Sequence, residues 1–161
     1  MPQYDSITAE EEHRFRANNI IYDHVFWGAW AGIVPVPLID LLFMTSLQLK
    51  MMREICVEYG VKFDLRQARA FLFALTGGGA SALATIGLSA GKATPAGVGV
   101  GVSLAVLAGA STYAVGRVFL SQLEKAREMS ALDANSAKEE YQELLKEGQE
   151  IVRDAAKRIT Q

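Results

Sequence analysis

Two long runs without charge dominate the middle of this chain and limit what it can fold into. Residues 70–91 contain no Asp, Glu, Lys or Arg, and neither do residues 93–116. Each run is long enough for a helix of about 30 Å, which matches the hydrocarbon core of a bilayer. The pattern therefore predicts an all-α protein with a membrane-embedded helical hairpin at about 70–119, formed by helices over 70–90 and 95–119.

Small residues recur at helical spacing in both runs and favour the same interpretation. In water, each glycine weakens a helix by about 1 kcal/mol relative to alanine. In lipid, the helix persists because no water competes for its backbone, and columns of small residues let two backbones approach closely. We predict that such columns pack helix against helix, within the hairpin and between subunits. The residues are Gly87 and Gly91 in the first run, and Gly97, Gly101, Ala105 and Gly109 in the second.

A capping box predicts where the first amphipathic helix begins. Thr8 and Glu11 have the Thr-x-x-Glu spacing in which each side chain satisfies an exposed backbone N–H of the other residue. The helix is expected to run towards Gly32, with Trp27 and Trp30 near its end. Tryptophans beside an apolar run serve either as membrane-interface anchors or as core anchors. Both interpretations remain open at this point.

Two prolines separate the first helix from the second. Pro35 and Pro37 interrupt helical hydrogen bonding, and Pro37 suits the first position of a new helix. That helix is predicted to extend to about Tyr59, with Gly60 as its C-cap. The uncharged stretch 25–39 is shorter than the ~20 residues that a spanning helix needs. The proline region is therefore re-entrant, interfacial or buried in protein.

Two further capping signals predict helices beyond these. Asp64 precedes the third helix, which leads into the first uncharged run. Ser136 and Glu139 have the spacing of a capping box for an exposed C-terminal helix that ends near Ile159 and repeats its apolar residues at helical intervals. Residues 129–135 read as the linker before it.

The distribution of charge predicts domain organisation and topology. Basic residues flank both uncharged runs, and only Lys92 lies between the runs. By the positive-inside tendency, both termini face the cytoplasm and the Lys92 turn faces away, in a bacterial inner membrane. Residues 1–128 form one helical membrane domain, and residues 129–161 form the linker and the C-terminal amphipathic helix. The N-terminal residues are polar and acidic, so no cleavable leader is expected.

Several functional classes find no support in the sequence. The net charge of −2 gives no basic field for nucleic acid. Cys56 is the only cysteine, which excludes an intrachain disulfide. His13 and His24 lie about three helical turns apart, too far for a shared metal site. The glycine and lysine at 91–92 lack the other residues of a phosphate-binding loop. We expect no catalytic residue, cofactor or metal.

Scattered motifs resemble one known family. The Pro-x-Pro-x-x-Asp motif after the first helix, Gln-Leu-Lys-Met in the second and Tyr-Ala-Val-Gly-Arg later are similar to the bacterial membrane family called domain of unknown function 697. The similarity covers roughly residues 18–125 and implies a helical membrane protein, often associated with GTPase domains. It implies no catalytic residue. The motif residues are Gly32, Pro35, Pro37, Asp40, Gln48, Lys50, Met51, Tyr59, Gly60, Tyr113, Gly116 and Arg117.

Taken with the resemblance, the sequence predicts a non-enzymatic membrane scaffold or adaptor. It would contact the lipid bilayer, self-associate as a homo-oligomer, and recruit a cytoplasmic partner, for which a GTPase is the candidate. Two alternatives remain open. One is a channel or pore-forming oligomer lined by the hairpin, and the other is a soluble helical bundle that buries the hairpin and inserts conditionally.

Overall fold

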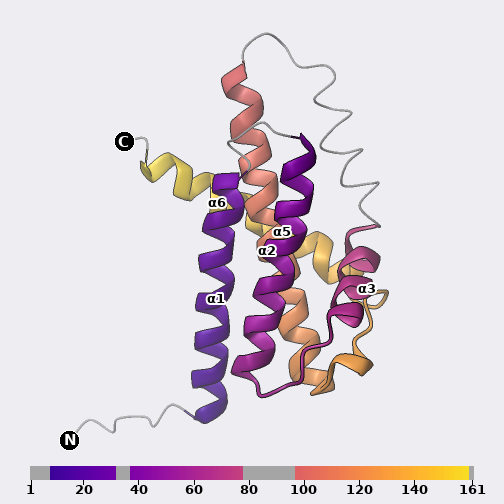
Figure 1. The fold of residues 1–161 in the computed structure, drawn as a ribbon. Coiled ribbons are helices and arrows are strands. Elements are labelled where there is room, and N and C mark those ends of the chain that lie inside the picture. Colours follow the sequence, from indigo (N-terminus) through magenta and orange to yellow (C-terminus); the bar gives the residue numbers. More distant parts are fainter. Residues whose placement is uncertain (1–7, 32–36, 78–96, 160–161) are drawn as a thin grey trace, which may run out of the picture.

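The computed structural model describes residues 8–31, 37–77 and 97–159 of the chain, and its regular structure there is entirely helical (Figure 1). The predicted all-α class is therefore confirmed for these residues. The elements are α1 (Ala9–Ala31), α2 (Pro37–Glu58), α3 (Leu65–Thr76), α5 (Gly97–Ala126), the 3₁₀ turn η2 (Met129–Ala131) and α6 (Lys138–Ile159).

Helix α5 is the centre of the bundle. Helices α1 and α6 make the most extensive contacts with it, and α2 packs against both α1 and α5. Helix α6 crosses the bundle obliquely instead of running along it (Figure 1). The largest fully buried side chains come from α1, α2 and α5, and they include Ile21, Met51, Met52, Ile55, Val115, Val118, Phe119 and Leu123.

The local signals at the helix ends are largely confirmed. The Thr8 N–H donates to Glu11 Oε2 at 2.8 Å, and the Glu11 N–H donates to Thr8 Oγ1 at 3.3 Å, as a capping box requires. Asp64 Oδ1 accepts from the Gln67 N–H at 2.9 Å. Gly60 follows α2 with φ +64°, a left-handed conformation that glycine adopts without strain.

The prediction of a continuous helix over 70–90 is wrong. Helix α3 ends at Thr76, because Gly77 adopts a left-handed conformation (φ 78°) and donates its N–H to the Phe73 carbonyl. Residues 78–90 lie outside the described part of the chain, as does the Lys92 turn. The first part of this run, residues 70–76, therefore belongs to a short helix that packs in the bundle.

The helix expected over 95–119 is longer and more enclosed than predicted. Helix α5 continues to Ala126, and Val115, Val118 and Phe119 are buried beneath neighbouring helices instead of facing outward. Within the described ranges, no helix is both long enough and apolar enough to cross a membrane. A spanning hairpin at 70–119 is thus not confirmed.

The capping box predicted for the C-terminal helix is also wrong. The Ser136 hydroxyl donates to the Asp133 carbonyl at 3.0 Å, and Asp133 Oδ1 accepts from the Ser136 N–H at 3.3 Å. Ser136 therefore belongs to a turn, and α6 begins at Lys138. The segment read as a linker contains η2, and its Met129 and Ala134 are buried.

Candidate functional site

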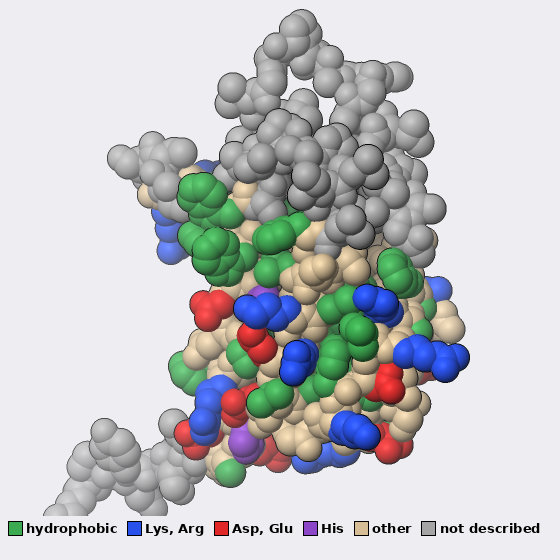
Figure 2. Space-filling model, in the orientation of Figure 1, with side chains coloured by type: hydrophobic (Ala, Val, Ile, Leu, Met, Phe, Trp, Pro, Cys, Tyr) green, Lys and Arg blue, Asp and Glu red, His purple; other side chains and the backbone are tan. Residues whose placement is uncertain are grey.

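Four helix ends with almost no charge gather at one end of the bundle. No charged residue occurs in 25–31 of α1, 70–76 of α3 or 97–116 of α5, and Asp40 is the single one in 37–49 of α2. These ends all point towards the top of Figure 1. Most charged side chains lie over the lower part of the molecule (Figure 2). The fold thus brings these four stretches together at one end of the bundle, which is called the uncharged end below and in which Asp40 is the single charged residue.

An exposed aromatic cluster borders this uncharged end. The side chains of Phe26, Trp27 and Trp30 are 53%, 59% and 56% exposed. The centroid of the Phe26 ring lies 6.1 Å from that of the Trp27 ring and 6.4 Å from that of the Trp30 ring. Such exposure excludes the core-anchor interpretation of the two tryptophans. An exposed cluster of large aromatic side chains is typical of an interaction surface.

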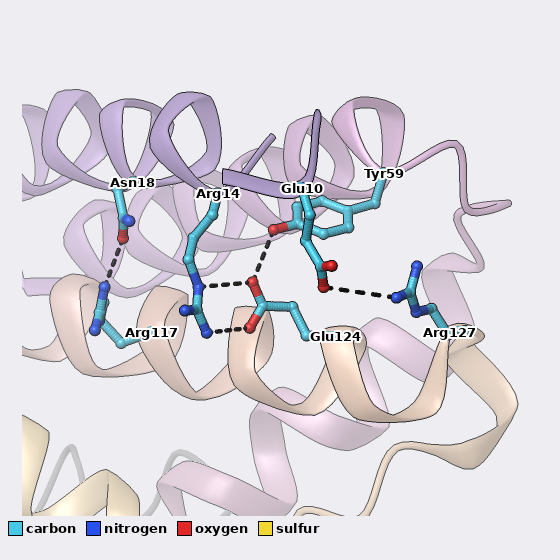
Figure 3. A network of polar contacts seen from close by, with 7 residues as sticks. All are labelled: Glu10, Arg14, Asn18, Tyr59, Arg117, Glu124 and Arg127. Carbon is cyan, nitrogen blue, oxygen red and sulfur yellow. Dashed lines mark hydrogen bonds and ion pairs between the residues drawn. The ribbon is translucent and has the colours of Figure 1, made fainter. Parts of the chain in front are cut away.

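A network of polar side chains holds the opposite end together (Figure 3). Glu124 of α5 accepts hydrogen bonds from Arg14 Nε at 3.0 Å and Arg14 Nη2 at 2.7 Å. It also accepts from the Tyr59 hydroxyl at 2.8 Å. Arg117 donates to Asn18 Oδ1 at 2.6 Å. These bonds join α1, α5 and the residue that follows α2, at the end that is remote from the aromatic cluster.

The groups in this network are suited to holding helices and not to transferring protons. Burial, with the hydrogen bond to Glu124, raises the pKa of Tyr59 far above its usual value. The same carboxylate raises the pKa of Arg14 further, so the guanidinium stays charged. The Arg14 side chain is 63% exposed, which limits the ion pair to ~1 kcal/mol or less. The network contains no activated nucleophile.

A shallow cleft lies beside this network. Its volume is about 500 Å³, and Glu10, His13, Glu58, Tyr59 and Arg127 contribute to its lining. The polar side chains of the lining already contact each other: His13 Nδ1 lies 2.8 Å from Glu58 Oε1, and Arg127 Nη2 lies 3.7 Å from Glu10 Oε1. The cleft therefore offers no charge that lacks a protein partner.

The family-motif residues divide between the core and the polar end. Tyr59 and Arg117 both belong to the polar network. A Cβ added at Gly116 would lie 3.0 Å from Met51 Sδ, so the structure brings Gly116 and Met51 together between α5 and α2. Gly60 ends α2.

Other motif residues make contacts along the bundle, and some are not described. Gln48 Nε2 donates to Ser111 Oγ at 3.4 Å, and the Tyr113 hydroxyl donates to Glu147 at 2.9 Å. Lys50 pairs with Glu54 at 3.4 Å. In the remaining group, Pro37 begins α2 and Asp40 lies in its first turn, whereas Gly32 and Pro35 are outside the described residues.

Gly109, the last residue of the predicted small-residue column on α5, packs against α6 and α1. A Cβ at Gly109 would lie 2.9 Å from Val152 Cγ2 and 3.2 Å from Ala29 Cβ. Ala105 is buried. Gly97 and Gly101 lie in the first two turns of α5, and Gly87 and Gly91 fall outside the described residues.

Two other glycines at helix contacts were not predicted from the sequence. Gly28 lies against α5, where a Cβ would be 2.8 Å from Thr112 Oγ1. Gly148 of α6 lies against the α5 backbone, where a Cβ would be 3.0 Å from both Cα and O of Ala110. Gly148 was recognisable, because a glycine at an apolar position of an amphipathic helix marks a close approach.

The two histidines are not brought together. His13 is in the polar cleft, whereas His24 is buried, with Nδ1 2.8 Å from the Ile20 carbonyl oxygen. His24 Nε2 has no hydrogen-bond partner in the described part of the chain, and it lies 3.7 Å from Glu54 Oε2. Among the described residues, no group of three or more His, Cys, Asp or Glu side chains could hold a metal ion.

One family model and one curated protein match most of the chain. The family described as "Domain of unknown function (DUF697)" matches residues 6–150. The chain is similar to "Magnetosome membrane protein 22" of Magnetospirillum gryphiswaldense, with 35% identity over 142 residues. That match covers 84% of this chain and 71% of the relative. No solved structure matches the chain.

Proposed function

The chain belongs to the family described as domain of unknown function 697, and we propose that it is a non-enzymatic, membrane-associated helical scaffold. One observation carries the proposal: the ends of α1, α2, α3 and α5, in which Asp40 is the single charged residue, gather at one end of the bundle beside three exposed aromatic rings. The name of the similar magnetosome protein, which places that relative in a membrane, supports it.

The proposed orientation follows from the cost of burying charge in lipid. The uncharged end and the adjoining segment 78–96 contact the bilayer, and Trp27 and Trp30 lie at the interface, where tryptophan is favoured. The polar end, with its network around Glu124, stays in water, because moving its charged groups into lipid would cost several kcal/mol. The bundle then projects from a bacterial inner membrane with both termini in the cytoplasm.

Fractionation of cells that express the full chain tests membrane association. We expect the protein to sediment with membranes and to resist high-salt and carbonate washes. Recovery of most of the native protein in the soluble fraction, as a monodisperse species without detergent, would overturn the proposal.

Cysteine labelling tests the proposed orientation. Cys56 is replaced by serine, and a new cysteine is introduced at Thr94, in the turn expected to face away from the cytoplasm. Labelling of this cysteine only from the outer side is the expected result. Labelling only from the cytoplasm would contradict a membrane crossing. It would favour a re-entrant segment that enters and leaves the bilayer on the cytoplasmic side.

The proposal also includes self-association in the membrane. The contacts of Gly109 use one part of the small-residue column within the chain, and Gly97 and Gly101 would serve contacts between subunits in lipid. We expect Gly101→Leu to insert normally but to lose larger assemblies in nanodiscs, as measured by mass photometry. A monomeric wild-type protein in nanodiscs would refute self-association.

The proposal further includes recruitment of a cytoplasmic partner. Helix α6 packs one face on α5 and leaves charged side chains such as Glu139, Glu143 and Lys146 exposed. A GTPase remains the candidate partner. Crosslinking from a photoreactive residue at Glu143 in cells is expected to capture a cytoplasmic protein, and a GTPase among the products identifies it. Capture of membrane lipid alone at this position would refute recruitment through this face.

A second candidate function is a helical bundle that is soluble until a trigger makes it insert into a membrane. The C-terminal half of α5 is buried by the other helices, as in a soluble bundle. The two candidates differ in where the native protein is found. A conditional inserter is recovered in soluble form and enters vesicles only after a trigger, whereas the proposed scaffold is membrane-bound throughout.

A further inference from the structure

The end of α6 lies beside the aromatic end of α1. Val152 and Ala29 converge on Gly109 of α5, where an added Cβ would be 2.9 Å from Val152 Cγ2 and 3.2 Å from Ala29 Cβ. The residue after Ala29 is Trp30, and the residues after Val152 form the last turns of α6. Figure 1 shows the two helix ends at the same edge of the bundle. Two segments far apart in sequence thus share one edge.

Helix α6 is basic at this edge and acidic at the other. Between Lys138 and Glu150 it carries five acidic and two basic side chains. Between Arg153 and Ile159 it carries three basic side chains and one acidic side chain, Asp154. Figure 2 shows Lys or Arg side chains next to hydrophobic ones at this edge. The combination places positive charge beside exposed aromatic rings.

The arginines at this edge differ from Arg14, Arg16 and Arg127 at the polar end. Arg14, Arg16 and Arg127 each pair with a glutamate, at 2.7, 2.7 and 3.7 Å. Arg153 and Arg158 are exposed, and neither forms an ion pair within the part of the chain that the structure describes. Their guanidinium groups can therefore bind an external anion, and their planar geometry suits phosphate oxygens.

We propose that the last two turns of α6, together with Phe26, Trp27 and Trp30, bind the phosphate-bearing headgroups of anionic lipids. This inference rests on the proposed function, since it requires the uncharged end to contact a bilayer. Indole rings favour the interfacial depth at which lipid phosphates lie, and basic side chains beside them meet those phosphates. The uncharged end continues the same surface into the bilayer, which favours lipid over an acidic protein as the ligand.

Tryptophan fluorescence provides a direct test, because Trp27 and Trp30 are the only two tryptophans of the chain. The full chain is reconstituted in phosphatidylcholine vesicles that contain a minor, equal fraction of either brominated phosphatidylcholine or brominated phosphatidylglycerol. Bromine quenches nearby indole rings, so the quenching reports which lipid is enriched at the patch. We expect a preference for phosphatidylglycerol of about fivefold for each basic side chain that contacts the surface.

Two charge-matched double variants separate this site from the overall charge. Arg153→Gln with Arg158→Gln is expected to remove most of the preference. Lys62→Gln with Lys125→Gln removes the same charge from exposed positions at the polar end and is expected to retain it. Circular dichroism verifies that each variant keeps its helical content. Added salt should weaken the wild-type preference, because these charges are screened.

Each outcome decides between the inference and the function on which it rests. If neither brominated lipid quenches the wild-type protein, the proposed membrane contact of this end is refuted. Equal quenching by both lipids overturns the headgroup inference and leaves the membrane contact intact. If the two double variants lose the preference equally, the effect is general electrostatics, and the site on α6 is refuted.

Discussion

Replacing Gly116 with alanine tests how closely α1, α2 and α5 approach one another. An added Cβ would lie 2.8 Å from Ile21 Cγ1, 3.0 Å from Ile21 Cγ2 and 3.0 Å from Met51 Sδ. Both Ile21 and Met51 are 0% exposed, so neither side chain can move into solvent to make room. Their displacement must be absorbed by the core or by a shift of a whole helix.

Two opposing effects set the magnitude. Overpacking of a core typically costs ~1–3 kcal/mol. Alanine is more favourable than glycine inside a helix by about 1 kcal/mol, which offsets part of that cost. We therefore expect Gly116→Ala to lower the free energy of unfolding by about 0–2 kcal/mol. Urea unfolding in detergent micelles, followed by far-ultraviolet circular dichroism, measures it.

A double-mutant cycle with Ile21→Ala tests the assigned cause. Ile21→Ala alone is expected to cost ~2–5 kcal/mol, because it leaves a cavity. In that background the methyl group at position 116 enters the vacated space, so Gly116→Ala becomes neutral or stabilising. The same destabilisation by Gly116→Ala in both backgrounds would refute the packing argument.

Gly60→Ala serves as the control for this cycle. A Cβ there would meet nothing within 4 Å, but the residue has φ +64°. The expected cost is about 1–2 kcal/mol, and it comes from the left-handed backbone alone. It should therefore be the same with and without Ile21→Ala.

Three further predictions follow from the polar network, the buried thiol and the crossing of α6. Glu124→Ala should lower the free energy of unfolding by ~1–2 kcal/mol, chiefly because the Tyr59 hydroxyl loses its acceptor while the exposed Arg14 loses little; an unchanged urea midpoint would contradict this. Burial raises the pKa of Cys56 from 9.0 to about 11, so its contribution to stability is complete below 9.0 and is lost as the pH rises through about 11. Thiol reagents should therefore label it only after unfolding, and prompt labelling of native protein would refute its burial. Gly148→Ala should loosen α6, because the new Cβ meets the α5 backbone at 3.0 Å, and limited proteolysis should then cleave α6 faster than in wild type.

The parts of the fold that the sequence predicted correctly depend on neighbouring residues. Thr8 with Glu11, Asp64 with Gln67, and Gly60 each act within one helical turn, so the pattern of residue types could indicate them. The same local pattern failed at Ser136, because Asp133 binds that residue in a turn. The all-α class follows from the same periodic and capping signals.

The parts that could not be predicted depend on residues distant in sequence or on competing readings of one residue. Arg14 and Glu124 are 110 positions apart, and nothing in either sequence neighbourhood indicates the other. Gly77 could be read as a small membrane residue or as a C-cap, and the structure assigns the second role. Lipid contact, self-association and partner recruitment are not properties of one chain in isolation, so they stay predictions.

The central position of α5 has a consequence for the order in which the chain is made. The polar bonds that attach α1 to α5 join residues 99 and 110 positions apart, so α1 leaves the ribosome long before its main partner exists. Residues 78–96 emerge before α5 does. During that interval the bundle cannot close, and the glycine-rich segment is available to a bilayer or to a chaperone before it is available to its own fold. The rate of translation through residues 97–126 therefore sets how long the glycine-rich segment can bind a bilayer or a chaperone before the bundle closes.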